Sequence, residues 1–164
     1  MLYLDDDDRL MWLDILGTAV SRSGFLCHSY CQMGTHYHLL VETPEPNLAV
    51  GMQRLNWLYS RTINKKYGMR GHLFEARYAS ELIQSEGHLL NTISYIALNP
   101  VEADICRSPL DWEWSSYRAT LGLASRPPFL STDLVLGAFD DRPEVARRQL
   151  RWLVEGVNPY LEAA

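Results

Sequence analysis

Two histidines separated by one residue, His36 and His38, are the first side chains in this sequence whose spacing suggests chemistry. They begin an apolar alternation, and residues two apart on a β-strand project from the same face. Tyr37, Leu39 and Val41 would then point into a core. Two neighbouring imidazoles can bind a divalent metal and leave other coordination positions open. The pattern alone favours a pair of surface histidines, so a metal site needs support from elsewhere in the chain.

A predicted helix over residues 86–98 provides that support. Its tyrosine, Tyr95, faces away from the expected buried stripe, and Asn99 lies one turn on, within about 40° of it. A tyrosine hydroxyl can be a covalent nucleophile, and a divalent metal assists its attack on an anionic phosphodiester. His36, His38, Asn99 and Tyr95 therefore form a coherent set for strand cleavage. An exposed tyrosine beside a helix C-cap asparagine remains the simpler local interpretation. The buried stripe consists of Leu89, Ile93 and Ile96.

Composition predicts a single domain with a sizeable core, since 47% of the residues are hydrophobic and 11% are aromatic. Cys27, Cys31 and Cys106 lack disulfide or zinc spacing, which favours a reducing compartment, and we expect the cytoplasm. The aspartates at 5–8 argue against a signal peptide. No apolar run has membrane-spanning length, so no membrane partner is expected.

Charge is unevenly distributed along the chain. The formal net charge of −5 argues against a simple nucleic-acid binder. Residues 51–80 nevertheless hold six basic residues and a single acid, Glu75. Such a segment can bind a phosphate backbone, although a solvated helix face explains the charge equally simply. The basic residues are Arg54, Arg61, Lys65, Lys66, Arg70 and Arg77.

Hydrophobic periodicity predicts helices over 5–22, 48–66, 86–98, 131–139 and 143–155. It predicts strands over 25–33, 36–42 and 71–83, the first two forming a hairpin. The stripe of the first helix should include Leu10, Leu13 and Ala19.

The second helix should begin at Asn47 and bury one face, with its basic residues on the opposite face. Trp57 is interpreted as a packing residue rather than a base-stacking one. The third helix should end at Asn99, because a residue before proline avoids the helical region. The buried face of the second helix consists of Leu48, Met52, Leu55, Tyr59 and Ile63.

Two blocks of the sequence resemble one known family. His36-Tyr37-His38 resembles the HUH motif of single-tyrosine transposases, and Tyr95-Ile96-Ala97-Leu98-Asn99-Pro100-Val101 resembles the tyrosine helix of their REP-associated branch. The resemblance covers about residues 4–121, in the family's order. Further matches are Asn64 with Gly68, Gly71-His72-Leu73-Phe74, Arg77, and Trp112-Glu113-Trp114-Ser115-Ser116-Tyr117.

The resemblance implies an α+β fold, with a ferredoxin-like antiparallel sheet covered by helices on one side. Residues 1–124 would form the catalytic domain and residues 125–164 a C-terminal helical extension. The implied partner is single-stranded DNA, often with a hairpin, and monomer and homodimer both stay open. The implied reaction is cleavage by Tyr95 through a 5′-phosphotyrosine, followed by rejoining, with Mg²⁺ or Mn²⁺ held by His36, His38 and Asn99. The residues implied to contact DNA phosphates are Arg54, Arg61, Lys65 and Arg77.

The sequence departs from the family pattern in two places. Met33-Gly34-Thr35-His36 stands where the family usually has Met-Pro-Asn-His, and only four residues precede the first helix where the family has a strand. Loss of a central strand would leave its neighbours without hydrogen-bond partners, so we expect truncation to impair activity. The alternative function is a truncated or domesticated, non-catalytic binder of structured single-stranded DNA. An unrelated metalloprotein or RNA-processing domain is the weaker third option.

Overall fold

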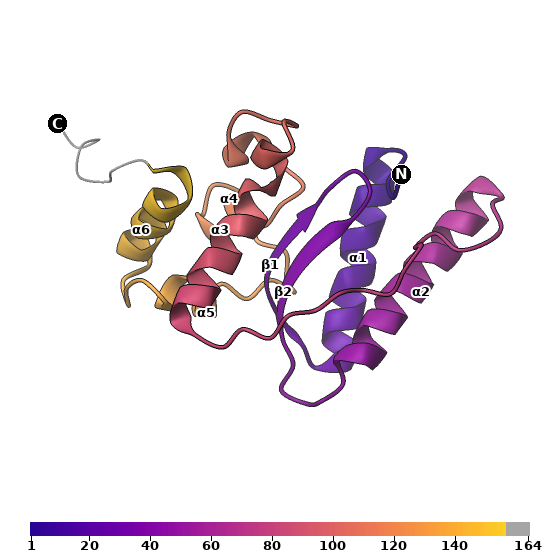
Figure 1. The fold of residues 1–164 in the computed structure, drawn as a ribbon, viewed down its shortest axis with the longest axis horizontal. Coiled ribbons are helices and arrows are strands. Elements are labelled where there is room, and N and C mark those ends of the chain that lie inside the picture. Colours follow the sequence, from indigo (N-terminus) through magenta and orange to yellow (C-terminus); the bar gives the residue numbers. More distant parts are fainter. Residues whose placement is uncertain (157–164) are drawn as a thin grey trace. The chain divides into compact units, whose positions relative to one another are not determined.

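The computed structural model describes residues 1–156, and this part of the chain combines helices with a two-stranded sheet (Figure 1). The expected α+β class is confirmed. The strands are β1 (Leu26–Gln32) and β2 (Tyr37–Glu42). The helices are α1 (Asp6–Ser23), α2 (Leu48–Tyr67), α3 (Glu86–Glu102), the short 3₁₀ helix η1 (Pro109–Asp111), α4 (Tyr117–Thr120), α5 (Asp133–Gly137) and α6 (Pro143–Glu155).

The chain forms two compact units, which interleave along the sequence. The first unit comprises Met1–Leu26, Gly34–His36 and Glu42–Leu82. The second comprises Cys27–Met33, Tyr37–Val41 and the described residues from Ile83 onwards, up to residue 156. The expected domains, residues 1–124 and 125–164, stay a prediction. No helix within residues 1–156 is long and apolar enough to cross a bilayer.

The first unit is built on α1 packed against α2. Asp5 caps α1 by accepting the Asp8 N–H at 2.8 Å, and Gly24 ends the helix with a φ of 69°. The expected stripe is wrong at Leu10, which is 53% exposed. The apolar residues of α1 are distributed over several sides of the helix, so periodicity alone does not identify the inner face. The face that is buried consists of Asp8, Trp12, Ile15, Leu16, Ala19 and Val20.

Most of the predicted α2 stripe is confirmed, because Met52, Leu55, Tyr59 and Ile63 are buried. The Tyr59 hydroxyl donates to the Leu2 carbonyl at 2.9 Å, which ties the N-terminal residues to this helix. Leu48, by contrast, is only half-buried.

Asn47 occupies the predicted N-cap position of α2 but does not cap the helix with its side chain. Its Nδ2 instead donates to the Ser23 carbonyl at 2.9 Å, near the end of α1. The residue therefore links the two helices of the first unit, a contact that local sequence does not reveal.

The strand predicted over 71–83 is wrong, because this segment has no regular secondary structure. Gly71 has a φ of 109°, which lies outside the range of a β-strand, and its carbonyl accepts from Asn64 Nδ2 at 2.9 Å. A segment of strand-like composition forms a strand only where a neighbouring strand completes its hydrogen bonds.

The second unit has its core where α3 meets the C-terminal helices. Ile93 and Ile96 of α3 are buried as predicted, while Leu89 is only partly buried. The predicted end at Asn99 is wrong, because α3 continues through Pro100 to Glu102. Backbone bonding resumes after the proline, since Ala103 N–H donates to the Asn99 carbonyl at 3.0 Å.

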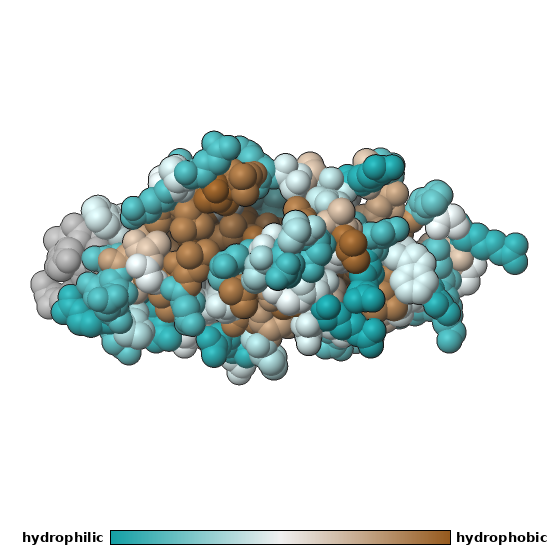
Figure 2. All heavy atoms as spheres, turned by 90° about the horizontal axis from the view of Figure 1, so that it is seen from below, coloured by the Kyte–Doolittle hydropathy of each residue, from teal (hydrophilic) through white to brown (hydrophobic). Residues whose placement is uncertain are grey.

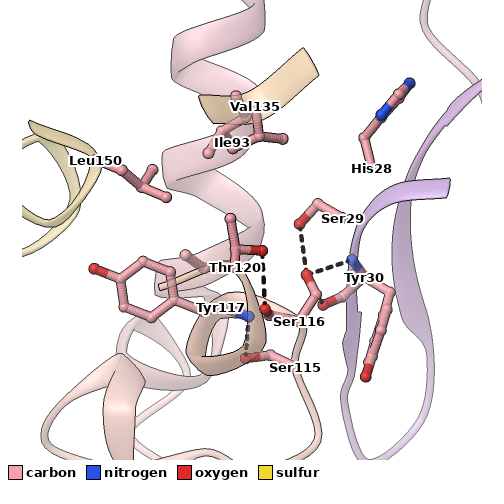
Figure 3. A pocket seen from close by; sticks show the side chains of 11 residues that line it. His28, Ser29, Tyr30, Ile93, Ser115, Ser116, Tyr117, Thr120, Val135 and Leu150 are labelled. Carbon is pink, nitrogen blue, oxygen red and sulfur yellow. Dashed lines mark hydrogen bonds between the residues drawn. The ribbon is translucent and has the colours of Figure 1, made fainter. Parts of the chain in front are cut away.

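Irregular segments cover the edge of β1 that β2 leaves open. Gln32 N–H donates to the Trp114 carbonyl, Ser116 N–H to the Tyr30 carbonyl and Ser131 N–H to the Cys27 carbonyl, at 2.8–2.9 Å. The buried Ser116 hydroxyl also accepts the Tyr30 N–H at 2.9 Å (Figure 3). The Trp-Glu-Trp-Ser-Ser-Tyr block thus satisfies backbone groups that an open strand edge would expose.

Apolar side chains also gather around a hollow on one face of the molecule (Figure 2). An open groove of the second unit lies at the start of α3 and beside α5, lined by Ile83, Ser85, Glu86, Leu89, Leu134, Gly137 and Ala138. Tyr95 lies about 9 Å further along α3 than Leu89, at 1.5 Å per residue. The groove therefore lies more than one helical turn from Tyr95 along α3.

Candidate active site

The structure brings His38 of β2 against Tyr95 of α3. Their ring centroids are 5.3 Å apart, and the ring planes meet at 82°, an edge-to-face arrangement. Tyr95 is 49% exposed because its neighbours Ile93, Ile96 and Ala97 form the buried face of α3. The prediction that Tyr95 lies off the core side of the helix is therefore confirmed, and the His38 imidazole lies beside it. Its role as a nucleophile stays a prediction.

Asn99 supports the same site from one turn further along α3. Its Nδ2 donates to the Tyr95 backbone carbonyl at 2.8 Å. The side chain is only 9% exposed, so the expectation that Asn99 shares the exposed face of Tyr95 is wrong in part. Because Nδ2 is bonded to the helix, Oδ1 is the amide atom that can act as a ligand.

The face of β2 that packs on the core is the face that carries His38, and it differs from the predicted one. Leu40, two residues after His38, is the buried residue of this strand and joins the core with Ile93 and Ile96. Tyr37, Leu39 and Val41, expected in the core, are only half-buried. The histidine face of β2 therefore packs towards α3, which accounts for the His38–Tyr95 contact.

His36 lies in the first unit, just before β2, and is exposed. Its Nδ1 is 3.1 Å from the Thr35 hydroxyl, within hydrogen-bond distance. Of the four predicted residues, the structure thus brings together His38, Tyr95 and Asn99 within the second unit.

The metal-ligand chemistry can be tested against the donor types. Among residues 1–156 no three His, Cys, Asp or Glu side chains converge as a metal site. The predicted set differs from such a group, because it combines two imidazoles with one amide oxygen. Nitrogen and oxygen donors of this kind fit a divalent first-row cation such as Mn²⁺, and they leave positions open for a substrate oxygen.

The predicted DNA contacts all lie in the first unit and are all exposed: Arg54, Arg61 and Lys65 on α2, and Arg77 beyond it. Lys66 behaves differently, because its Nζ lies 2.7 Å from Asp8 Oδ1 and 3.0 Å from Asp5 Oδ2. The hydrogen bond from Lys66, with help from the Asp8 N–H, lowers the pKa of Asp5 to about 2.

The interpretation of Trp57 as a packing residue is wrong. This side chain is 57% exposed, and the Arg61 guanidinium carbon lies 5.2 Å from its ring centroid. Trp57 lies between basic residues at helical spacing, and this is the sequence signal that could have indicated an exposed side chain.

Comparison with known proteins gives two matches. Residues 2–99 match the family model described as "Transposase IS200 like". A protein of Haemophilus influenzae named "Putative REP-associated tyrosine transposase" is 29% identical over 99 residues, which cover 53% of this chain and 56% of that protein. No solved structure matches the chain.

Proposed function

The chain belongs to the family of IS200-like transposases, and from this we propose that it is a metal-dependent transposase that cuts and joins single-stranded DNA through Tyr95. One observation carries the proposal. Tyr95, an exposed tyrosine, lies edge-to-face with His38 and is hydrogen-bonded through its carbonyl to Asn99.

The proposed reaction is a transesterification at phosphorus. The Tyr95 oxygen forms a bond to the scissile phosphorus while the bond to the 3′-oxygen breaks. The phenolic proton is given up and the leaving 3′-oxygen ends as a hydroxyl, so the products are a 5′-phosphotyrosine and a free 3′-end. Attack by the 3′-hydroxyl of a second strand reverses the step and joins DNA. No nucleotide is hydrolysed, because one phosphodiester replaces another.

His36, His38 and Asn99 would hold the divalent cation, Mg²⁺ or Mn²⁺. Bound there, it would neutralise charge on the scissile phosphate and polarise it. Within the protein, Asn99 fixes the carbonyl of the nucleophile's own residue, and His38 packs against the ring. The contact with His38 restricts the Tyr95 ring, which favours an attack geometry prepared before the substrate binds.

The test is formation of a covalent adduct. The protein is incubated with a labelled, hairpin-bearing single-stranded oligonucleotide and Mg²⁺ or Mn²⁺, and adducts are resolved on a denaturing gel. We expect an adduct with the parent protein and none with Tyr95→Phe, which keeps the ring beside His38. His36→Ala should raise the metal concentration needed for half-maximal adduct.

An adduct that survives Tyr95→Phe would reject Tyr95 as the nucleophile. A folded parent protein that binds the oligonucleotide without any adduct in either metal would favour the alternative, a non-catalytic binder of structured single strands. The exposed basic face of α2 supports that alternative, because it does not involve Tyr95.

A further inference from the structure

The exposed face of α2 carries one aromatic residue within a row of cations. Arg54, Trp57, Arg61 and Lys65 follow one another at intervals of three, four and four residues, which aligns them on one side of the helix. The buried residues Met52, Leu55, Tyr59 and Ile63 form the opposite side at the same intervals. The row extends about 17 Å along the axis, the length of roughly five stacked nucleotides.

Trp57 is the unusual member of this row, because it leaves a large apolar ring 57% exposed at the middle of a helix. The Arg61 guanidinium carbon at 5.2 Å from the centroid restrains the ring by a cation–π contact. An indole held in this way is an exposed aromatic surface with little freedom to lose when a planar group stacks on it.

The cations beside Trp57 are available to a ligand. Among residues 1–156 the ion pairs do not involve Arg54, Arg61 or Lys65, whereas the neighbouring Lys66 is bonded to Asp5 and Asp8. α2 contains no acidic residue, in a chain whose formal net charge is −5. The row is thus a local positive surface complementary to a polyanion.

We propose that this row binds an unpaired segment of single-stranded DNA, with one base stacked on Trp57 and phosphates contacted by Arg54 and Lys65. Bases inside a duplex already stack on each other, so an exposed indole selects an unpaired base. The proposal deepens the proposed function, on which it rests for the choice of DNA, by assigning the base contact to Trp57.

The experiment measures binding without cleavage. Tyr95→Phe protein serves as the parent, and its affinity for a fluorescein-labelled single-stranded oligonucleotide is measured by anisotropy at several salt concentrations. Trp57→Ala should weaken binding by about 5- to 150-fold, the usual range for loss of one stacked base, and leave the salt dependence unchanged. Trp57→Phe should restore much of the affinity.

The basic residues should give the opposite signature. Arg54→Gln and Lys65→Gln should each reduce the slope of log affinity against log salt by about 0.7, the value for one phosphate contact to a single strand. Trp152→Ala is the matched control, because Trp152 is 53% exposed on α6, and its removal should change neither affinity nor slope.

An oligonucleotide of abasic sites separates stacking from charge. On this ligand the difference between the parent and Trp57→Ala should disappear. Equal weakening on both ligands would overturn the base contact, and so would unchanged binding by Trp57→Ala. If Trp57→Ala changed the oligomeric state of the protein in sedimentation but left its affinity for the oligonucleotide unchanged, the row would be a protein interface instead.

Two outcomes separate this proposal from the proposed function. Trp57-dependent binding by a protein that forms no adduct in its unmutated form would keep the stacking site and reject the transposase activity. If Trp57→Ala changed neither the yield of the adduct nor the affinity for the oligonucleotide, the transposase activity would stand and the stacking site would be rejected. Failure of the parent to bind single-stranded DNA overturns the stacking site.

Discussion

At the scale of single residues, Lys66 shows how one cation of a basic helix is given a structural role. Its Nζ is bonded to Asp8, which is fully buried, and to Asp5, the N-cap of α1. The Tyr67 hydroxyl donates to the same two carboxylates. This cluster joins the start of α1 to the end of α2, and it leaves only the other cations of α2 for a ligand.

The Asp5 carboxylate predicts an acid-sensitive contribution to stability. Its pKa is lowered from 3.8 to about 2 in the folded protein, chiefly by the Lys66 hydrogen bond. A lowered folded pKa means that the stabilisation is present above about pH 4 and is lost as the pH falls towards 2. Asp5→Asn keeps a side chain that can cap the helix but removes the charge.

We therefore expect the urea midpoint of Asp5→Asn to lie below that of the wild type at pH 6, with the gap closing between pH 4 and pH 2. Asp7→Asn, at an exposed position in the first turn of α1, is the control and should show a smaller gap. A wild-type advantage that stays constant down to pH 2 would contradict the prediction.

Contacts of single residues could be predicted from the sequence where the two residues are close along the chain. Helical geometry places Asn99 beside Tyr95, and the 2.8 Å hydrogen bond confirms that they are neighbours. Such prediction failed where the neighbour is distant in sequence. Nothing in the local pattern indicates that Leu40, on the histidine side of β2, packs with α3, or that Trp57 stays 57% exposed.

At the scale of elements, β1 depends on chain segments that are not strands. Its backbone bonds to residues 114–116 and to Ser131, in addition to its pairing with β2. The Ser116 hydroxyl contributes directly, because it accepts the Tyr30 N–H and lies 3.1 Å from the Ser29 hydroxyl, all in buried surroundings (Figure 3). A small side chain with an acceptor is therefore required at this position.

Ser116→Ala should reduce the free energy of unfolding by about 1–3 kcal/mol, because it leaves a buried N–H without its acceptor. Thr120→Val is the matched control. Its hydroxyl donates to the Ser116 carbonyl, which keeps the Thr120 N–H at 2.9 Å as a second donor, so the loss should be smaller. Urea denaturation measures both, and hydrogen exchange of the Tyr30 amide should accelerate only in Ser116→Ala. Equal losses in the two variants would contradict this account.

The elements themselves were predictable where a strong period coincides with clear ends. α1, α2 and α6 and the β-hairpin lie within two residues of the expected bounds. The failures have a common cause in tertiary context. The segment over 71–83 has strand-like composition but no strand partner, and Pro100 is accommodated in α3 because the helix resumes its hydrogen bonds beyond it.

At the scale of the whole chain, the C-terminal helices are part of the core that contains the candidate nucleophile's helix. Val135 and Leu136 of α5, and Ala146, Leu150 and Val154 of α6, form one cluster with Ile93 and Ile96 of α3. The Tyr117 hydroxyl adds a hydrogen bond to Glu155 Oε1 at 2.8 Å, joining α4 to α6. A sequence reading locates these helices but cannot show which apolar face they cover.

This shared core predicts that a change in α6 destabilises α3. Leu150 is 1% exposed, whereas Leu153, on the same helix, is 40% exposed, so the two leucines form a matched pair. Leu150→Ala should cost about 2–5 kcal/mol of unfolding free energy, and Leu153→Ala less than about 1 kcal/mol.

The informative measurement is hydrogen exchange of the Ile93 and Ile96 amides, because a common core unfolds as one unit. These amides should lose as much protection in Leu150→Ala as the amides of α6 do. If α6 loses protection while α3 keeps it, residues 125–164 are an independent extension, and the site at Tyr95 does not depend on them.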